Sequence, residues 1–87
     1  MNVIPSDIIA VIKRFPDRKE AIKKLFQKSR NFQSMCEDYF KCKQAFDYWN
    51  QPDIKNAAIP GKEYAALLQE LESEIIQKLD ENIYDNS

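Results

Sequence analysis

Apolar residues recur at helical spacing along most of the chain, and residues that favour turns separate the repeats. The first run, residues 8–12, follows Pro5 and Ser6 and predicts a short helix over residues 6–14. Pro16 should end this helix, because proline lacks the N–H group that a helix interior requires.

A second helix is predicted over residues 18–28. Asp17 and Glu20 fit a capping box, in which the aspartate accepts hydrogen bonds from unpaired N–H groups and the glutamate reaches back. One arc of this helix is apolar and must face the rest of the protein. The opposite arc carries four lysines, which we call the lysine surface: Lys19, Lys23, Lys24 and Lys28.

A long third helix is predicted over residues 31–50, with Asn31 as its cap. At 1.5 Å per residue it would span about 30 Å, which makes it the backbone of the fold. Apolar residues alternate along it at spacings of three and four, the pattern of a coiled-coil seam: Phe32, Met35, Tyr39, Cys42, Phe46 and Trp49. Four others widen the apolar surface: Cys36, Phe40, Ala45 and Tyr48. More than one neighbour should therefore pack against this helix.

The chain should then reverse direction. Residues 51–60 contain two prolines and indicate a ten-residue loop. Helical spacing resumes over residues 62–80, nearly the length of the third helix, and these matched lengths predict an antiparallel helical hairpin. The tail, residues 81–87, is mostly polar and should fray.

Composition supports a single helical domain over residues 1–87. A chain of 87 residues is too short for two cores, and its 44% apolar and 31% charged residues are typical of globular proteins. With one glycine and four prolines, the chain lacks the turns that a sheet needs. We therefore predict an all-α fold, a small helical bundle built on a long antiparallel helical hairpin with two short N-terminal helices.

The apolar run at residues 8–12 is too short for a signal-peptide core or a membrane span, so we expect a cytoplasmic protein with no membrane partner. Cys36 and Cys42 lie about 120° apart around the helix axis and cannot pair within that helix. Free, partly buried thiols in a reducing compartment are expected. An intermolecular disulfide or a redox role is the alternative.

Candidate chemistry is sparse. The chain has no histidine, which removes the commonest general base and metal ligand and argues against an enzyme. Glu70 and Glu74 could share a metal with Glu37 or Asp38, but bundle sites of this kind use a Glu-x-x-His element that is missing here. A solvated acidic face is the simpler interpretation. We predict no catalytic residues, no metal, no cofactor and no small-molecule substrate.

Charge is distributed unevenly behind a net charge of −1. Residues 1–30 carry eight basic and three acidic side chains, a net of +5, whereas residues 62–87 carry two basic and seven acidic ones, a net of −5. The lysine surface could pair with the acidic last helix and so fix the topology or drive head-to-tail association. Alternatively, it could meet an acidic protein or nucleic acid, although the acidity of the whole chain argues against nucleic acid.

Aromatic residues of the predicted third helix could stack on nucleic-acid bases, but their seam spacing is more typical of a core. Phe40 and Tyr48 are the expected exposed exceptions and would mark an interface. The candidate interaction surface thus consists of Lys19, Lys23, Lys24, Lys28, Phe40 and Tyr48.

The segment FPDRKEAIKKLFQKSRNF, residues 15–32, resembles the opening of the YdcH-like family of small bacterial proteins of unknown function. The matching features are Phe15-Pro16 followed by an acidic residue, Ile22 and Leu25 three apart, and Phe32 opening the long helix. The rest agrees in plan, with a long helix, a polar loop and a returning helix. The resemblance implies a helical hairpin and a bacterial source, and it brings no catalytic residues.

We expect a non-enzymatic protein-interaction or small accessory module that binds another protein or a second copy of itself as a homodimer. The alternative is a nucleic-acid-associated accessory protein that uses the lysine surface. Binding of that kind would weaken steeply with salt.

Overall fold

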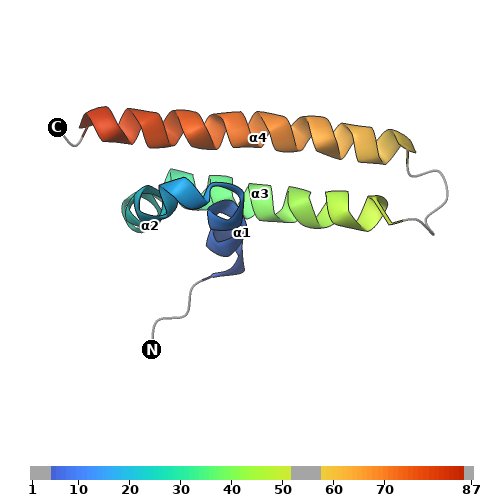
Figure 1. Ribbon diagram of the computed structural model, residues 1–87, viewed down its shortest axis with the longest axis horizontal. Helices are drawn as coiled ribbons and strands as arrows, with labels where there is room; N and C mark the ends of the chain where they lie inside the picture. The colour runs from blue at the N-terminus through green and yellow to red at the C-terminus, as the bar shows by residue number, and fades with distance from the viewer. Residues whose placement is uncertain (1–4, 52–57, 86–87) are drawn as a thin grey trace.

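The computed structural model describes the backbone of residues 5–51 and 58–85, and the side chains of residues 5–51 and 60–81. Within these ranges the chain forms four α-helices and one short 3-10 helix, and no strand (Figure 1). The fold is all-α, as the sequence predicts, and the helices pack around one hydrophobic core. None of the described helices is long and apolar enough to cross a membrane.

The N-terminal part of the chain forms two short helices joined by a tight turn. Helix α1, Ser6–Arg14, has the predicted bounds. The 3-10 helix η1, Pro16–Arg18, follows it, and the Arg18 N–H closes the turn by donating to the Phe15 carbonyl at 3.0 Å. Helix α2, Lys19–Lys28, starts at the next residue.

The predicted capping box at the start of α2 is wrong. Asp17 lies inside η1, Arg18 occupies the N-cap position of α2, and no side chain caps that helix. Pro16 explains the shift, because its fixed φ suits the first position of a helical turn and draws Asp17 into η1. Asp17 then lacks the extended backbone that an N-cap residue adopts.

Helix α3, Arg30–Trp49, is capped by Ser29 and not by the predicted Asn31. The Ser29 Oγ accepts a hydrogen bond from the Phe32 N–H at 3.0 Å, and the Ser29 backbone is extended. Serine is among the best N-cap residues and comes before Asn31 in the chain, so the helix begins earlier than predicted.

Helix α4, Ala58–Asp85, begins earlier than the predicted residue 62. Pro60 is compatible with this start because it lies in the first turn, where the N–H groups have no acceptor within the helix. Residues 58–60 of the predicted loop are therefore helical, and residues 52–57 lie outside the described part of the chain.

Helix α4 also ends later than predicted. The expected fraying is wrong for residues 81–85, which continue the helix. Leu79 is fully buried near this end, and Lys78 pairs with Glu81 at 3.4 Å, so packing and an i,i+3 ion pair both favour continuation. Residues 86–87 lie outside the description.

Helix α4 lies along α3, and the chain direction reverses between the two (Figure 1). Helices α1 and α2 also pack against α3. All four helices contribute buried side chains to the core: Ile8, Val11, Ile22, Leu25, Phe32, Cys36, Tyr39, Cys42, Leu68, Ile75 and Leu79. Helix α3 is thus the shared support of the other three.

The predicted seam of α3 is buried only in part. Its members Phe32, Tyr39 and Cys42 are buried, whereas the other three are half-buried. Cys36, which lies outside the seam, is fully buried. Because α1 and α4 pack against different sides of α3, the buried arc is wider than a coiled-coil seam and turned toward α1.

Candidate interaction surfaces

A groove runs between α1 and α3, and we call it the α1/α3 groove. Its volume is about 550 Å3. It is lined by Ser6, Ile9, Ala10, Lys13 and Arg14 of α1 and by Tyr39, Phe40, Lys43 and Asp47 of α3. Ile9 is 38% exposed although it is a large aliphatic residue, and Phe40 is half-buried. The floor of the groove is therefore apolar and open to solvent.

The rim of the α1/α3 groove is basic. Lys43 Nζ lies 3.0 Å from the Asp47 carboxylate on the same helix. Asp47 is the single acidic residue of the lining, so its charge is neutralised by Lys43. Lys13 is exposed and forms no ion pair with any described residue. The rim is thus left with uncompensated positive charge beside an apolar floor.

A contact between three helices holds the α1/α3 groove in place. The Arg14 guanidinium of α1 binds Glu72 of α4 through both carboxylate oxygens, at 2.8 and 3.3 Å. The Tyr39 hydroxyl of α3 donates to the same carboxylate at 3.1 Å. Burial, together with the negative charge of Glu72, raises the pKa of Tyr39 to about 12, so the phenol stays protonated and acts as a donor. Glu72 correspondingly raises the pKa of Arg14.

A second groove lies between α3 and α4, and we call it the α3/α4 groove. Its volume is about 430 Å3, and it is lined by Asp38, Lys41, Cys42, Ala45, Tyr64, Leu67 and Leu71. All of these residues belong to α3 or α4. Leu67 is 42% exposed, and Ala45, Tyr64 and Leu71 are half-buried. This groove is also apolar, but α1 and α2 do not line it.

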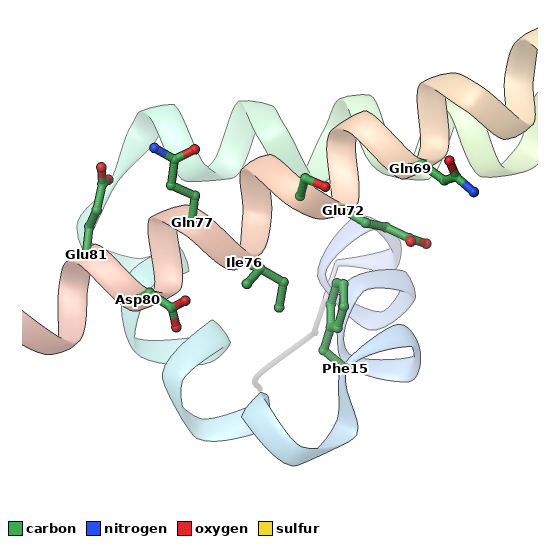
Figure 2. Close-up of a pocket in the computed structure, with 8 residues that line it drawn as sticks. Phe15, Gln69, Glu72, Ile76, Gln77, Asp80 and Glu81 are labelled. Atoms are coloured by element: carbon green, nitrogen blue, oxygen red, sulfur yellow. The ribbon is translucent and has the colours of Figure 1, made fainter.

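A third groove, of about 760 Å3, lies beside Phe15 on α4. Figure 2 shows Phe15 pointing toward α4, with Ile76 and three carboxylates, Glu72, Asp80 and Glu81, along the helix. Arg14 binds Glu72, and Arg18 Nη1 binds Asp80 at 2.7 Å. Because two arginines neutralise two of its carboxylates from within the chain, this groove joins the N-terminal helices to α4.

These two arginines show how the basic N-terminal part of the chain pairs with the acidic last helix. The basic N-terminal part does bind the acidic last helix, but through Arg14 and Arg18. Lys19, Lys23 and Lys24 form no ion pair with any described residue. Lys19, Lys23 and Lys24 are therefore not what orients α4.

The predicted interaction residues lie in three separate places. Three lysines of the lysine surface are exposed and Lys23 is half-buried. At about 100° per residue they spread over half the circumference of α2, with Glu20 and Gln27 between them. Phe40 lines the α1/α3 groove, whereas Tyr48 is 55% exposed and packs its ring edge-to-face with Trp49 at 5.3 Å.

Sequence reasoning missed Ile9, Lys13 and Leu67, which lie on the two open grooves. A signal for Ile9 was available, because the adjacent pair Ile8 and Ile9 covers more of the circumference of a short helix than one buried face requires. Leu67 had no such signal, since Leu68 beside it fits the same apolar pattern.

Both cysteine thiols are free and buried. Burial, together with the negative charge of Asp7, raises the pKa of Cys36 to about 12. The pKa of Cys42 is also raised by burial, and its thiol lies 3.7 Å from the Tyr64 carbonyl. Both thiols are therefore protonated near neutral pH, which makes them poor nucleophiles.

Among residues 5–51 and 60–81, no three acidic or cysteine side chains gather closely enough to hold a metal ion. Glu70 and Glu74 are both exposed on α4. Comparisons with protein families, curated proteins and solved structures find no match to this chain. The resemblance of residues 15–32 to the YdcH-like family stays a prediction from the sequence.

Proposed function

We propose that this chain is a non-enzymatic protein-interaction module whose α1/α3 groove binds an acidic amphipathic helix of another protein. Its scaffold is a helical bundle built on an antiparallel hairpin of α3 and α4. The observation that carries the proposal is the combination of an exposed apolar floor with a basic rim. We place this activity in the cytoplasm, as the sequence suggests.

The hairpin scaffold is supported by the contacts between α3 and α4. The Tyr39 hydroxyl binds Glu72, and the Cys42 thiol lies against the Tyr64 carbonyl. As the residue number rises along α3, the number of its contact on α4 falls, which is the order expected of antiparallel neighbours.

The apolar floor favours a helical ligand. An amphipathic helix places large apolar side chains at spacings of three and four, and such anchors need an open apolar groove between rigid elements. Ile9 and Phe40 provide that surface from two different helices. A large aliphatic residue exposed beside an aromatic one is typical of an interaction site.

The basic rim favours a ligand with acidic flanks. Lys13 has no ion-pair partner among residues 5–51 and 60–81, and the Lys43 ion pair with Asp47 is exposed and therefore weak. Carboxylates of a bound helix can reach both ammonium groups. Tyr39, the buried titratable group of the lining, keeps its proton at neutral pH and donates it to the Glu72 carboxylate in a hydrogen bond.

A matched pair of synthetic peptides tests this proposal. One amphipathic peptide carries leucines on one face and glutamates on the other, and its control carries lysines in place of the glutamates. Fluorescence anisotropy should show binding of the acidic peptide, weakened by salt, and little binding of the basic one. Ile9→Glu should abolish that binding, and Leu67→Glu, on the other groove, should preserve it. Equal binding of both peptides, or no effect of Ile9→Glu, would contradict the proposal.

A second candidate function is association with nucleic acid through the lysine surface. It is favoured by one observation, that Lys19, Lys23 and Lys24 have no ion-pair partner among the described residues. Titration with mixed RNA and DNA at low salt should then show binding that falls steeply with salt concentration. Indifference to both nucleic acids at low salt would remove this candidate.

A further inference from the structure

We propose that the α3/α4 groove is the site where a second copy of this chain packs, forming a two-fold symmetric dimer. The proposal uses a different surface from the α1/α3 groove and does not depend on what that groove binds. In this dimer, the surface around the exposed Leu67 contacts the second copy.

The α3/α4 groove is left open by the rest of the chain. Helices α1 and α2 contact α3, yet neither contributes a lining residue to this groove. Leu67 is 42% exposed at its edge, and Leu71 beside it is half-buried. An aliphatic row on two neighbouring helices loses contact with water when another pair of helices covers it, as in a four-helix bundle.

The rim charges favour a second copy over an unrelated partner. Asp38 and Lys41 line the groove from the same helix, one turn apart and opposite in sign. In a two-fold interface, residue i meets residue j and residue j meets residue i, so each Asp38 can lie against Lys41 of the other copy. Asp38 forms no ion pair with any described residue, although its charge adds to that of Glu37 in raising the pKa of Lys41. Lys41 Nζ binds the exposed Glu37 carboxylate at 2.8 Å. The rim is thus complementary to itself.

The size of the face lies at the lower end of what a specific dimer needs. Helix α3 has 20 residues, and at 1.5 Å per residue with helices about 10 Å wide the α3 and α4 pair presents roughly 600 Å2 of flat area. Side chains add to this figure, and a stable interface needs about 800 Å2 of accessible surface from each partner. A chain of 87 residues also buries a modest fraction of its own surface, which leaves room for stabilisation by association.

A charge exchange tests the geometry directly. Asp38→Lys alone and Lys41→Asp alone each place like charges together twice in a symmetric dimer. Each change should raise the dissociation constant of the dimer about fivefold. An equal mixture of the two variants pairs lysine with aspartate at both contacts, so it should restore dimerisation as a heterodimer. Sedimentation or light scattering over a concentration series measures all three samples. A mixture no tighter than either single variant would overturn the proposed pairing.

A second variant tests the apolar face. Leu67→Glu should weaken the dimer about a hundredfold, because a buried charge would replace an aliphatic contact of the interface. Leu67 is partly exposed, so helicity should persist, and circular dichroism checks this. Ile9→Glu is the matched control, since it adds the same charge to the other groove and should leave the dimer intact. A wild-type chain that stays monomeric at several hundred micromolar, or a Leu67→Glu chain that dimerises like wild type, would overturn the proposal.

Discussion

The α1/α3 groove and the α3/α4 groove flank the same helix, and each exposes one large aliphatic side chain, Ile9 in the first and Leu67 in the second. Their rims differ in charge. Lys13 leaves the first rim basic, whereas Asp38 and Lys41 balance the second. If both grooves bind as proposed, burial of apolar area should drive both contacts, while charge should select what is bound.

The two grooves also differ in how they are built. The α1/α3 groove depends on Arg14, Glu72 and Tyr39, which tie three helices together through one carboxylate. The α3/α4 groove needs only the side-by-side packing of two long helices. Changes at the three-helix contact should therefore affect the two grooves unequally, and the following variants measure that difference.

The largest effect is expected from Tyr39→Ala. This change empties a core position that is 2% exposed and removes the hydroxyl that binds Glu72, so it should destabilise the fold by about 4 kcal/mol. Urea unfolding monitored by circular dichroism measures the loss. At a temperature at which the Tyr39→Ala variant is still folded, peptide binding to the α1/α3 groove should weaken more than dimerisation does. Equal loss of both would show that the two grooves are not separable.

Alkaline pH should have the next largest effect. The pKa values of Cys36 and Tyr39 are each raised to about 12, so the folded state holds these protons more tightly than the unfolded state. Their contribution to the free energy of unfolding is complete below about pH 9 and is lost as the pH rises through 12. This contribution is on the order of 2 kcal/mol for each group. Urea midpoints between pH 8 and 11.5 measure the decline. Tyr39→Phe should flatten the upper part of that decline, and an unchanged profile would contradict the assignment.

A smaller effect concerns the reactivity of Cys42. This thiol lines the α3/α4 groove and is 5% exposed, whereas Cys36 is fully buried in the core. If a second copy covers the groove, Leu67→Glu should speed modification of Cys42 by a thiol reagent about tenfold, through loss of the cover. Mass spectrometry of digests distinguishes the two cysteines. A uniform acceleration at both positions would indicate general loosening and not exposure of the groove.

The smallest effect is expected from charge reversal on α2. Lys19→Glu together with Lys24→Glu alters two exposed side chains that have no ion-pair partner in the described part of the chain. The free energy of unfolding should therefore change by less than about 0.5 kcal/mol. Dimerisation and peptide binding should be unchanged, because neither groove includes these residues. Nucleic-acid binding, if present, should be lost. A large loss of stability would show instead that the lysine surface is structural.

The helices themselves could be predicted largely from the sequence, because helical periodicity and proline positions are local signals. The bounds of α1 were predicted correctly. Errors arose where two local signals compete: Ser29 and Asn31 can each cap α3, and Pro60 can either break a helix or occupy its first turn. Tertiary packing decides such cases, as the buried Leu79 does for the end of α4.

The grooves could be predicted only in part. Phe40 was expected to be exposed because it extends the apolar surface of α3 beyond the seam. It is instead half-buried and lines the α1/α3 groove. The pairing of Phe40 with Ile9 depends on how α1 crosses α3, and periodicity does not determine a crossing. The charge gradient correctly predicted attraction between the chain ends. It did not identify the arginines as the partners, because their short distances to Glu72 and Asp80 depend on the packed arrangement.

The contact of Arg14 with Glu72 joins residues 58 positions apart in the chain, and that of Tyr39 with Glu72 joins residues 33 apart. During synthesis, α1 and α3 therefore leave the ribosome before the carboxylate that contacts both of them. If the α1/α3 groove binds a partner as proposed, its three-helix contact forms only after the chain has been translated past Glu72. A chain truncated before Glu72 should then bind the acidic peptide more weakly than the full chain.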